Sequence, residues 1–165
     1  TGNQRDALLA VDRNLMCKRN LRAFVGHRFV NQVTKNLRHN LQRILGAYGI
    51  RLEYSDSDMP NAHVFDVILK RLKSADFCIF DDRCTEVRPN VFIELGAAIA
   101  LDRPYFYLNH RRKAAVLIRG SKQRIEIPSD LAGMLCVPYS TYDELFFELV
   151  TKLPGFLASR KLATR

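Results

Sequence analysis

The sequence has no tryptophan and only four cysteines, and no two cysteines form a Cys-x-x-Cys pair. This spacing provides neither a disulfide framework nor, with four scattered histidines, a zinc site, so we expect no metal site. No apolar run approaches the ~20 residues that span a bilayer. Charged side chains among the first twenty residues argue against a signal peptide. We therefore expect a cytoplasmic protein without a membrane partner.

Acidic residues are scarce beside basic ones, with 17 Asp and Glu against 26 Lys and Arg, which gives a formal net charge of +9. Such a balance favours an anionic partner, either a nucleotide, a nucleic acid or an acidic surface, although it also serves solubility alone. The most basic stretch, 109–124, contains no aromatic residue that could stack on bases. A solvated loop is therefore favoured there, and nucleic acid is not the expected partner.

A chain of 165 residues with 47% apolar and 26% charged residues has the composition of one soluble globular domain. Helical spacing of apolar residues predicts a leading helix within residues 1–20. The pattern then predicts one domain over 21–158 and a frayed tail over 159–165.

Apolar strand-like runs alternate with amphipathic segments along this domain. Helices are expected over 31–48 and 90–101. A third helix is expected after Asn61, with Val64, Phe65, Ile68 and Leu72 on its buried face. A last helix is expected after two overlapping capping boxes that begin at Ser140 and Thr141. Strands are expected at 21–25, 50–54, 77–80, 104–108 and 134–137. This alternation predicts an α/β fold, a flavodoxin-like three-layer sandwich with a central, mostly parallel five-stranded sheet.

The predicted helix 90–101 holds the most informative residue of the chain. Between Val91 and Leu101 every residue is apolar or glycine except Glu94. A helix this apolar is normally buried on nearly all sides, and burying an unpaired carboxylate is costly. Glu94 should therefore either form a buried salt bridge with an arginine or face a cavity. A position near the first turn would favour its ionised form through the helix dipole.

Topology favours the cavity. In a flavodoxin-like sheet, ligands bind beyond the carboxyl ends of the first and third strands, where the strand order reverses. Each residue near that point also has a structural explanation: Gly26 can permit a tight turn, Asp81 can cap a turn, and Asn90 can be a helix N-cap. Together they favour a site with Glu94 and Asp81 as catalytic residues. The candidate substrate-binding residues are Gly26, His27, Arg28, Phe29, Asp82, Arg88 and Asn90.

The stretch ADFCIFDDRCTEVRPNVFIELGAAIALDRPYFYL, from Ala75 to Leu108, resembles a segment of the TIR-like nucleotide-binding proteins and, through them, of the nucleoside 2-deoxyribosyltransferases. The run AFVGHRF is similar to the first strand of that group. PSDLAG and YSTYDEL are similar to its closing segment, so the resemblance extends over residues 21–155. The sequence departs from the pattern at Asp102-Arg103, where the family usually has Gly-Lys before the proline of the fourth strand.

The resemblance implies that Glu94 is the catalytic glutamate, that Asp81 lies in the site, and that residues after the first strand contact ribose or base. It further implies cleavage of an N-glycosidic bond, with NAD as a substrate rather than a cofactor. The expected function is that of an NAD glycohydrolase or ADP-ribosyl cyclase in bacterial antiviral defence, activated by homo-oligomerisation or a partner protein. Two alternatives stay open: a nucleoside 2-deoxyribosyltransferase or hydrolase, and a non-catalytic module that senses a nucleotide or oligomerises.

Overall fold

A computed structural model describes residues 20–27, 31–55, 64–81, 89–110 and 136–162. The predicted leading helix lies outside these residues. The described elements, in chain order, are β1 (Arg22–His27), α2 (Asn31–Gly46), β2 (Arg51–Tyr54), α3 (Val64–Ser74), β3 (Phe77–Asp81), α4 (Pro89–Ala100), β4 (Tyr105–His110), β5 (Cys136–Tyr139) and α5 (Tyr142–Ser159).

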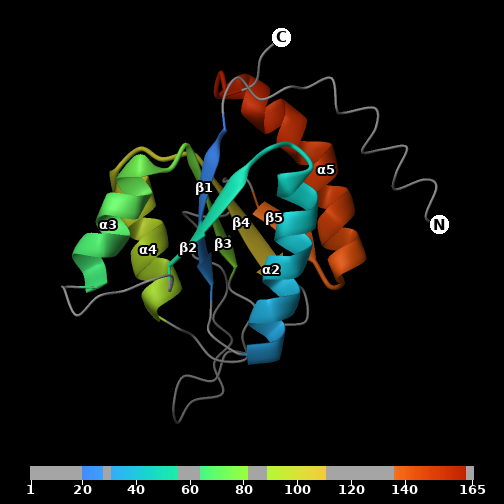
Figure 1. Ribbon diagram of the computed structural model, residues 1–165, viewed down its shortest axis with the longest axis horizontal. Coiled ribbons are helices and arrows are strands. Elements are labelled where there is room, and N and C mark those ends of the chain that lie inside the picture. The colour runs from blue at the N-terminus through green and yellow to red at the C-terminus, as the bar shows by residue number, and fades with distance from the viewer. Residues whose placement is uncertain (1–19, 28–30, 56–63, 82–88, 111–135, 163–165) are drawn as a thin grey trace.

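The five strands form one sheet in the order β2-β1-β3-β4-β5, and all four pairings are parallel (Figure 1). This confirms the predicted flavodoxin-like α/β architecture. The order reverses between β1 and β3, so the switch point lies where the sequence placed it. No described helix is long and apolar enough to cross a membrane.

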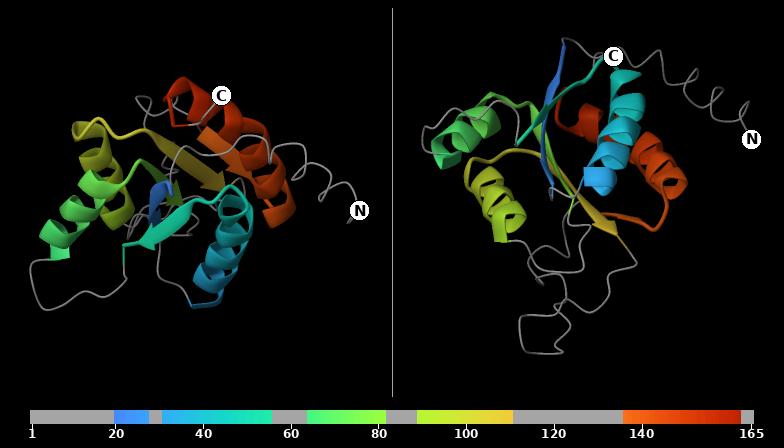
Figure 2. Two further views of the ribbon diagram at one scale, coloured as in Figure 1. Left: turned by 45° about the horizontal axis from the view of Figure 1, so that its top comes forward. Right: turned by 60° about the horizontal axis from the view of Figure 1, so that its bottom comes forward.

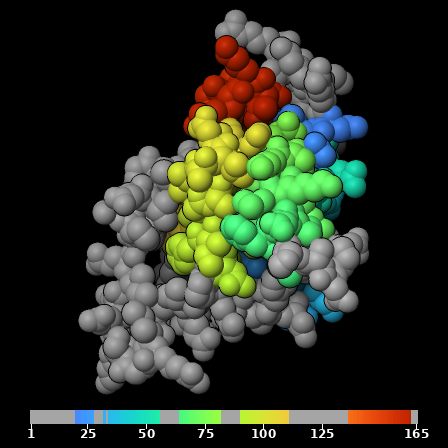
Figure 3. Space-filling model, turned by 90° about the vertical axis from the view of Figure 1, so that its left-hand side faces the viewer, coloured from blue at the N-terminus to red at the C-terminus, as the bar shows by residue number. Residues whose placement is uncertain are grey.

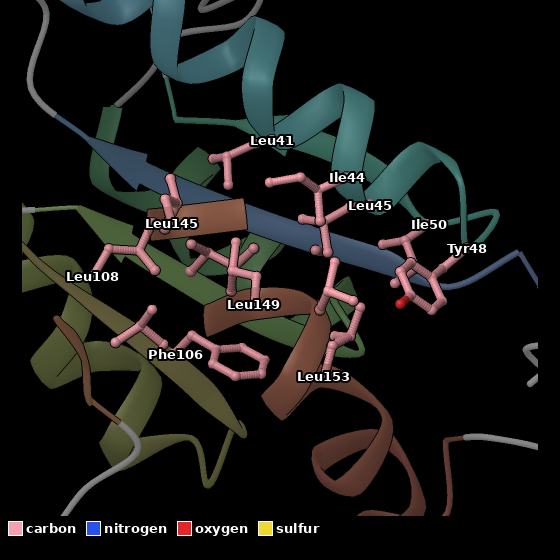
Figure 4. Packing of buried hydrophobic residues seen from close by; sticks show 14 of the residues in the cluster. Leu41, Ile44, Leu45, Tyr48, Ile50, Phe106, Leu108, Leu145, Leu149 and Leu153 are labelled. Atoms are coloured by element: carbon pink, nitrogen blue, oxygen red, sulfur yellow. The ribbon is translucent and has the colours of Figure 1, made fainter. Parts of the chain in front are cut away.

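Helices cover both faces of the sheet, which gives the three predicted layers (Figures 1 and 2). On one face α2 and α5 pack together over the sheet; Leu41 and Ile44 of α2 meet Leu145 and Leu149 of α5 there (Figure 4). On the other face α3 and α4 cover a smaller cluster that includes Leu72. A parallel sheet is stable in this arrangement because both of its faces are kept from water.

Alternation along β1 decides which face each side chain reaches. Val25 packs in the cluster under α2 and α5, whereas Phe24 packs in the cluster under α3 and α4. Successive side chains of a strand point to opposite faces. Gly26 therefore belongs to the α4 side and His27 to the α2 side. By the same rule Asp81, after Phe80 on the α4 side, points to the α2 and α5 side.

Two expectations about buried faces are wrong. On α3, Ile68 and Leu72 are buried as predicted, but Val64 and Phe65 are about half exposed. On α4, Ile93 and Ile99 are exposed, so this helix is not buried on nearly all sides. Both helices belong to an outer layer of the molecule, so the side of each helix that faces away from the sheet is exposed even where its residues are apolar.

Helix ends and strand ends differ in how well they were predicted. Thr141 of the second predicted capping box is the N-cap of α5 and accepts a hydrogen bond from the Glu144 N–H. The Glu144 side chain accepts one from the N–H of Ser140, the residue before the cap. Gly49 has a positive φ of 72°, consistent with the predicted stop after α2. The last two strands extend further than predicted, with β4 ending at His110 and β5 at Tyr139.

Candidate functional site

The buried polar side chains of the described residues lie together at the carboxyl edge of the sheet. His27, Asp81 and His110 are the last residues of β1, β3 and β4, and Ser55 directly follows β2. The remaining one, Glu94, reaches the same edge from α4. Burying polar groups costs free energy unless they are hydrogen-bonded. Their concentration at one edge therefore makes this edge the candidate functional site of the described part of the chain.

Glu94 lies against the backbone of β1. A β-carbon added to Gly26 would collide with Oε2 of Glu94 and would lie 2.7 Å from Cδ1 of Phe80. Gly26 has no positive φ, so the glycine is required here by the close approach of Glu94 and not by a left-handed turn. The structure thus brings together the two predicted residues Glu94 and Gly26.

Glu94 is not held by a salt bridge to any described residue. Only 6% of its surface is exposed, and within the described ranges its Oε2 has no hydrogen-bond partner. Burial raises the pKa of Glu94 to about 7. The expectation that the helix dipole favours its ionised form is wrong, because α4 begins at Pro89 and Glu94 lies in the second turn, where the dipole has faded and desolvation dominates.

Asp81 has a fixed orientation. The hydroxyl of Tyr139, the last residue of β5, donates a hydrogen bond to Oδ1 of Asp81 at 2.6 Å. The imidazole of His110 packs edge-on against the Tyr139 ring, with 5.0 Å between the ring centroids. Asp81 is 2% exposed, so this short bond contributes to placing a carboxyl group that water does not solvate.

His27 is held by α2 and β2. Nε of Arg38 donates to Nε2 of His27 at 3.1 Å, and a guanidinium can only donate, so Nε2 carries the lone pair and the ring proton of a neutral imidazole lies on Nδ1. The Arg38 guanidinium also stacks over the Tyr54 ring at 4.2 Å. His27 packs against the same ring at a centroid distance of 5.6 Å. The imidazole is thereby oriented from two sides.

The two carboxyl groups approach the sheet edge from opposite faces. Glu94 lies on the α4 side over Gly26, whereas Asp81 points to the α2 and α5 side, next to His27, its register partner in β1. A ligand lying across the edge could meet both. No group of three or more metal-ligating side chains occurs in the described part of the chain.

The remaining predicted site residues have different outcomes. Arg28, Phe29, Asp82 and Arg88 lie outside the described residues. Asn90 is the second residue of α4 and is exposed, so it is not the N-cap that the sequence suggested. Pro89 occupies the first helical position, where the missing N–H of proline carries no penalty.

Sequence reasoning missed Tyr139, His110 and Arg38. The first two follow from the same rule that located Asp81, namely that the last residues of parallel strands meet at one edge. They were missed because β4 and β5 were predicted to end two residues early. Arg38 carries no such signal, because a basic residue in an amphipathic helix is normally solvated.

The bond between Tyr139 and Asp81 can be tested by removing one hydroxyl. Tyr139→Phe is expected to lower the free energy of unfolding by about 1–3 kcal/mol, because it leaves a buried carboxyl oxygen without this partner. Tyr105→Phe is the matched control, since the Tyr105 hydroxyl is buried with no partner among the described residues and its removal should be nearly neutral. Urea unfolding of both variants measures the difference, and equal losses would contradict the assigned role.

The fold and this edge define a class: an α/β domain of the TIR-like and nucleoside-deoxyribosyltransferase-like kind, with a buried glutamate at the switch point of its sheet. Residues 22–141 match the family model described as "CAP12/Pycsar effector protein, TIR domain". This match extends over most of the chain, which therefore belongs to that family. A search of the curated proteins found no relative.

Several solved structures share the fold. A CMP N-glycosidase, BcmB, from Clostridium botulinum superposes with a TM-score of 0.57 at 17% identity, covering 79% of this chain and 98% of that one. A conserved protein from Enterococcus faecalis V583 gives 0.58 at 11% identity, covering 81% and 99%. A 2-deoxyribosyltransferase from Bacillus psychrosaccharolyticus gives 0.50 at 14% identity, covering 76% and 90%. At these identities the likeness establishes the fold alone.

Proposed function

We propose that this domain cleaves the N-glycosidic bond of a nucleotide with Glu94 as its catalytic residue, and that the bond is the one between nicotinamide and ribose in NAD. The observation that carries the proposal is the Glu94 carboxyl group, buried at the switch point without a partner among the described residues. Family membership supports it. Two of the structures with the same fold are named as an N-glycosidase and a deoxyribosyltransferase, which also act on glycosidic bonds.

Breaking the bond between ribose C1′ and the nicotinamide nitrogen leaves the electron pair on nitrogen and positive charge on the sugar. The ionised Glu94 carboxylate stabilises this charge or attacks C1′. Water then supplies the new C1′–O bond and loses a proton, which gives ADP-ribose. If a nitrogen of the adenine ring attacks instead, the product is a cyclic ADP-ribose. Asp81, held by Tyr139, contributes by orienting the ribose hydroxyls.

The pKa of Glu94 determines how the rate of this mechanism should change with pH. Nicotinamide leaves as a neutral molecule without needing a proton, so only the ionised carboxylate is active. Because burial raises the pKa of Glu94 to about 7, kcat/KM should rise as the pH increases towards 7 and level off above it.

The same pKa also favours the second candidate, cleavage of a nucleoside by a deoxyribosyltransferase or hydrolase. A neutral base leaves poorly and needs a proton from a general acid, and a carboxyl group that is half protonated near pH 7 can provide one. In that case activity through Glu94 should fall as the pH rises above 7. The two candidates therefore predict opposite pH profiles.

The proposal is tested by mass spectrometry of the products after incubation with NAD, and separately with a panel of nucleosides, at high protein concentration. Release of nicotinamide with ADP-ribose or its cyclic form supports the proposed cleavage of NAD, and release of a free base from nucleosides supports the second candidate. Binding of NAD in a thermal-shift assay without any product would instead indicate a nucleotide-sensing module. Turnover per chain that rises with protein concentration would fit the proposed activation by self-association in antiviral defence.

A further inference from the structure

A cavity of about 680 Å³ opens at the opposite, amino-terminal edge of the sheet. Its described walls are the end of α4, the turn before β4, the first residue of β4 and the last turns of α5. Figure 3 shows the red end of α5 lying against the yellow end of α4 on this side of the molecule. The volume lies within the ~300–1,000 Å³ of small-molecule sites. None of the residues at the Glu94 edge lines it.

Two buried polar atoms beside this cavity have no hydrogen-bond partner in the described part of the chain. They are Nε of Arg103 and the hydroxyl of Tyr105, and both residues line the cavity. Among the described residues, the Arg103 guanidinium makes one hydrogen bond, a long one of 3.4 Å from Nη1 to the carbonyl oxygen of Ala75. Both atoms can donate a hydrogen bond, and the residues that carry them form part of the cavity wall, so this wall suits a ligand that brings acceptor atoms.

Helix α5, which forms one wall of the cavity, contains two residues that disfavour helices. Pro154 lies inside α5, and Gly155 beside it lines the cavity. In a helix interior proline costs about 3 kcal/mol and glycine about 1 kcal/mol relative to alanine. A β-carbon on Gly155 would meet no atom within 4 Å. The missing side chain therefore keeps space open in the cavity wall and is not required by a neighbouring atom.

Charge and surface indicate what the cavity accepts. Arg103, Lys152 and Arg160 outnumber Asp102 among the charged lining residues, although Lys152 also pairs with Glu148 at 2.7 Å. An excess of positive charge favours a phosphate group. Apolar residues, among them the largely buried Phe156, form the rest of the described wall, which suits a planar base.

We propose that this cavity is a second site, which binds a nucleoside monophosphate with its phosphate towards Arg103 and its base against the apolar wall. The site is separate from the Glu94 edge, so it does not depend on the function proposed for that edge. A ligand bound here would bridge the α4–β4 turn and α5, elements that lie on opposite faces of the sheet.

Isothermal titration calorimetry of the full chain with AMP, adenosine and inorganic phosphate tests the proposal. AMP should bind saturably, with each of the other two at least about tenfold weaker, since neither carries both groups. Gly155→Leu should place a side chain in the cavity, starting from a β-carbon that meets no atom within 4 Å, and weaken AMP binding at least about tenfold. Gly96→Leu is the matched control, because Gly96 is an exposed helix glycine with equally open space that does not line the cavity.

Three results would overturn the second site. They are no saturable AMP binding by the wild-type chain, equal AMP binding by Gly155→Leu and wild type, and adenosine binding as tight as that of AMP. If Gly155→Leu fails to fold, as judged by its melting temperature, Arg103→Met replaces it and must show the same tenfold loss. AMP binding that is weakened by Gly26→Ala and untouched by the cavity variants would assign the ligand to the other edge and equally refute the proposal.

Discussion

Replacing Glu94 by Gln should lower glycosidic-bond cleavage at least about 100-fold while it leaves the fold intact. The amide has nearly the same shape as the carboxyl group, so the contact with Gly26 is kept. It cannot carry the negative charge that stabilises the developing positive charge on the ribose. Initial rates of product formation from NAD and from nucleosides measure the loss.

The same substitution should change how stability depends on pH. The pKa of Glu94 is raised from 4.5 to about 7 by burial, so between these values the folded protein binds more protons than the unfolded chain. The free energy of unfolding of the wild type therefore falls as the pH rises from 4.5 to 7 and levels off above 7. This difference amounts to about 3 kcal/mol for one group. The Gln variant lacks this loss, so its stability relative to wild type should increase over the same range.

Glu148→Gln provides the control for both measurements, because it is the same chemical change in a helix at a surface ion pair with Lys152. It should alter neither turnover nor the pH dependence by a comparable amount. Undiminished cleavage by the Glu94 variant would remove this residue from the mechanism. A constant stability difference between pH 5 and 8 would instead show that the Glu94 carboxyl group is not buried in solution.

Patterns in the sequence were sufficient to predict the structure where a single physical effect decides it. Phe77 to Phe80 form a run of apolar residues without alternation, and β3 is indeed buried along its whole length in the middle of a parallel sheet. The alternation of elements predicted a parallel sheet, and with the flavodoxin-like order that the structure confirms, the switch point near Gly26, Asp81 and Glu94 followed from topology. The sequence predicted that Glu94 and Gly26 belong to one site at this point, but not the direct approach of the carboxyl group to the Gly26 backbone.

Prediction from the sequence failed where two physical effects oppose each other, or where the burial of a helix depends on which other elements pack against it. The helix dipole and desolvation act in opposite directions on Glu94, and only the helix start at Pro89 shows that desolvation prevails. Ile93 and Ile99 are exposed although their helix is apolar, because no pattern in the chain reveals how many layers cover a helix. The bond from Tyr139 to Asp81 joins residues 58 positions apart and depends on strand ends that propensity does not locate.

Gly26→Ala should have the second large effect, because it places a methyl group where the Glu94 carboxyl group lies. The new carbon would collide with Oε2 of Glu94 and approach Cδ1 and Cε1 of Phe80 to 2.7 and 3.0 Å. The Phe80 ring is completely buried in the core, whereas the Glu94 carboxyl group is the end of a flexible side chain. Glu94 should therefore give way, and a displacement of about 1 Å at a catalytic group can cost about 100-fold in rate.

A double-mutant cycle separates this mechanism from general damage to the fold. Gly26→Ala alone should cost about 1–3 kcal/mol of stability by overpacking. In a Glu94→Ala background the colliding oxygen is gone, so Gly26→Ala should cost less stability there. The coupling energy between the two substitutions should therefore fall in the range of about 0.5–3 kcal/mol that is typical of contacting residues. Gly96→Ala, a helix glycine with open space, should be neutral or stabilising. Strict additivity, or full activity of Gly26→Ala, would mean that Glu94 does not lie over β1 in solution, and the catalytic assignment would fail with it.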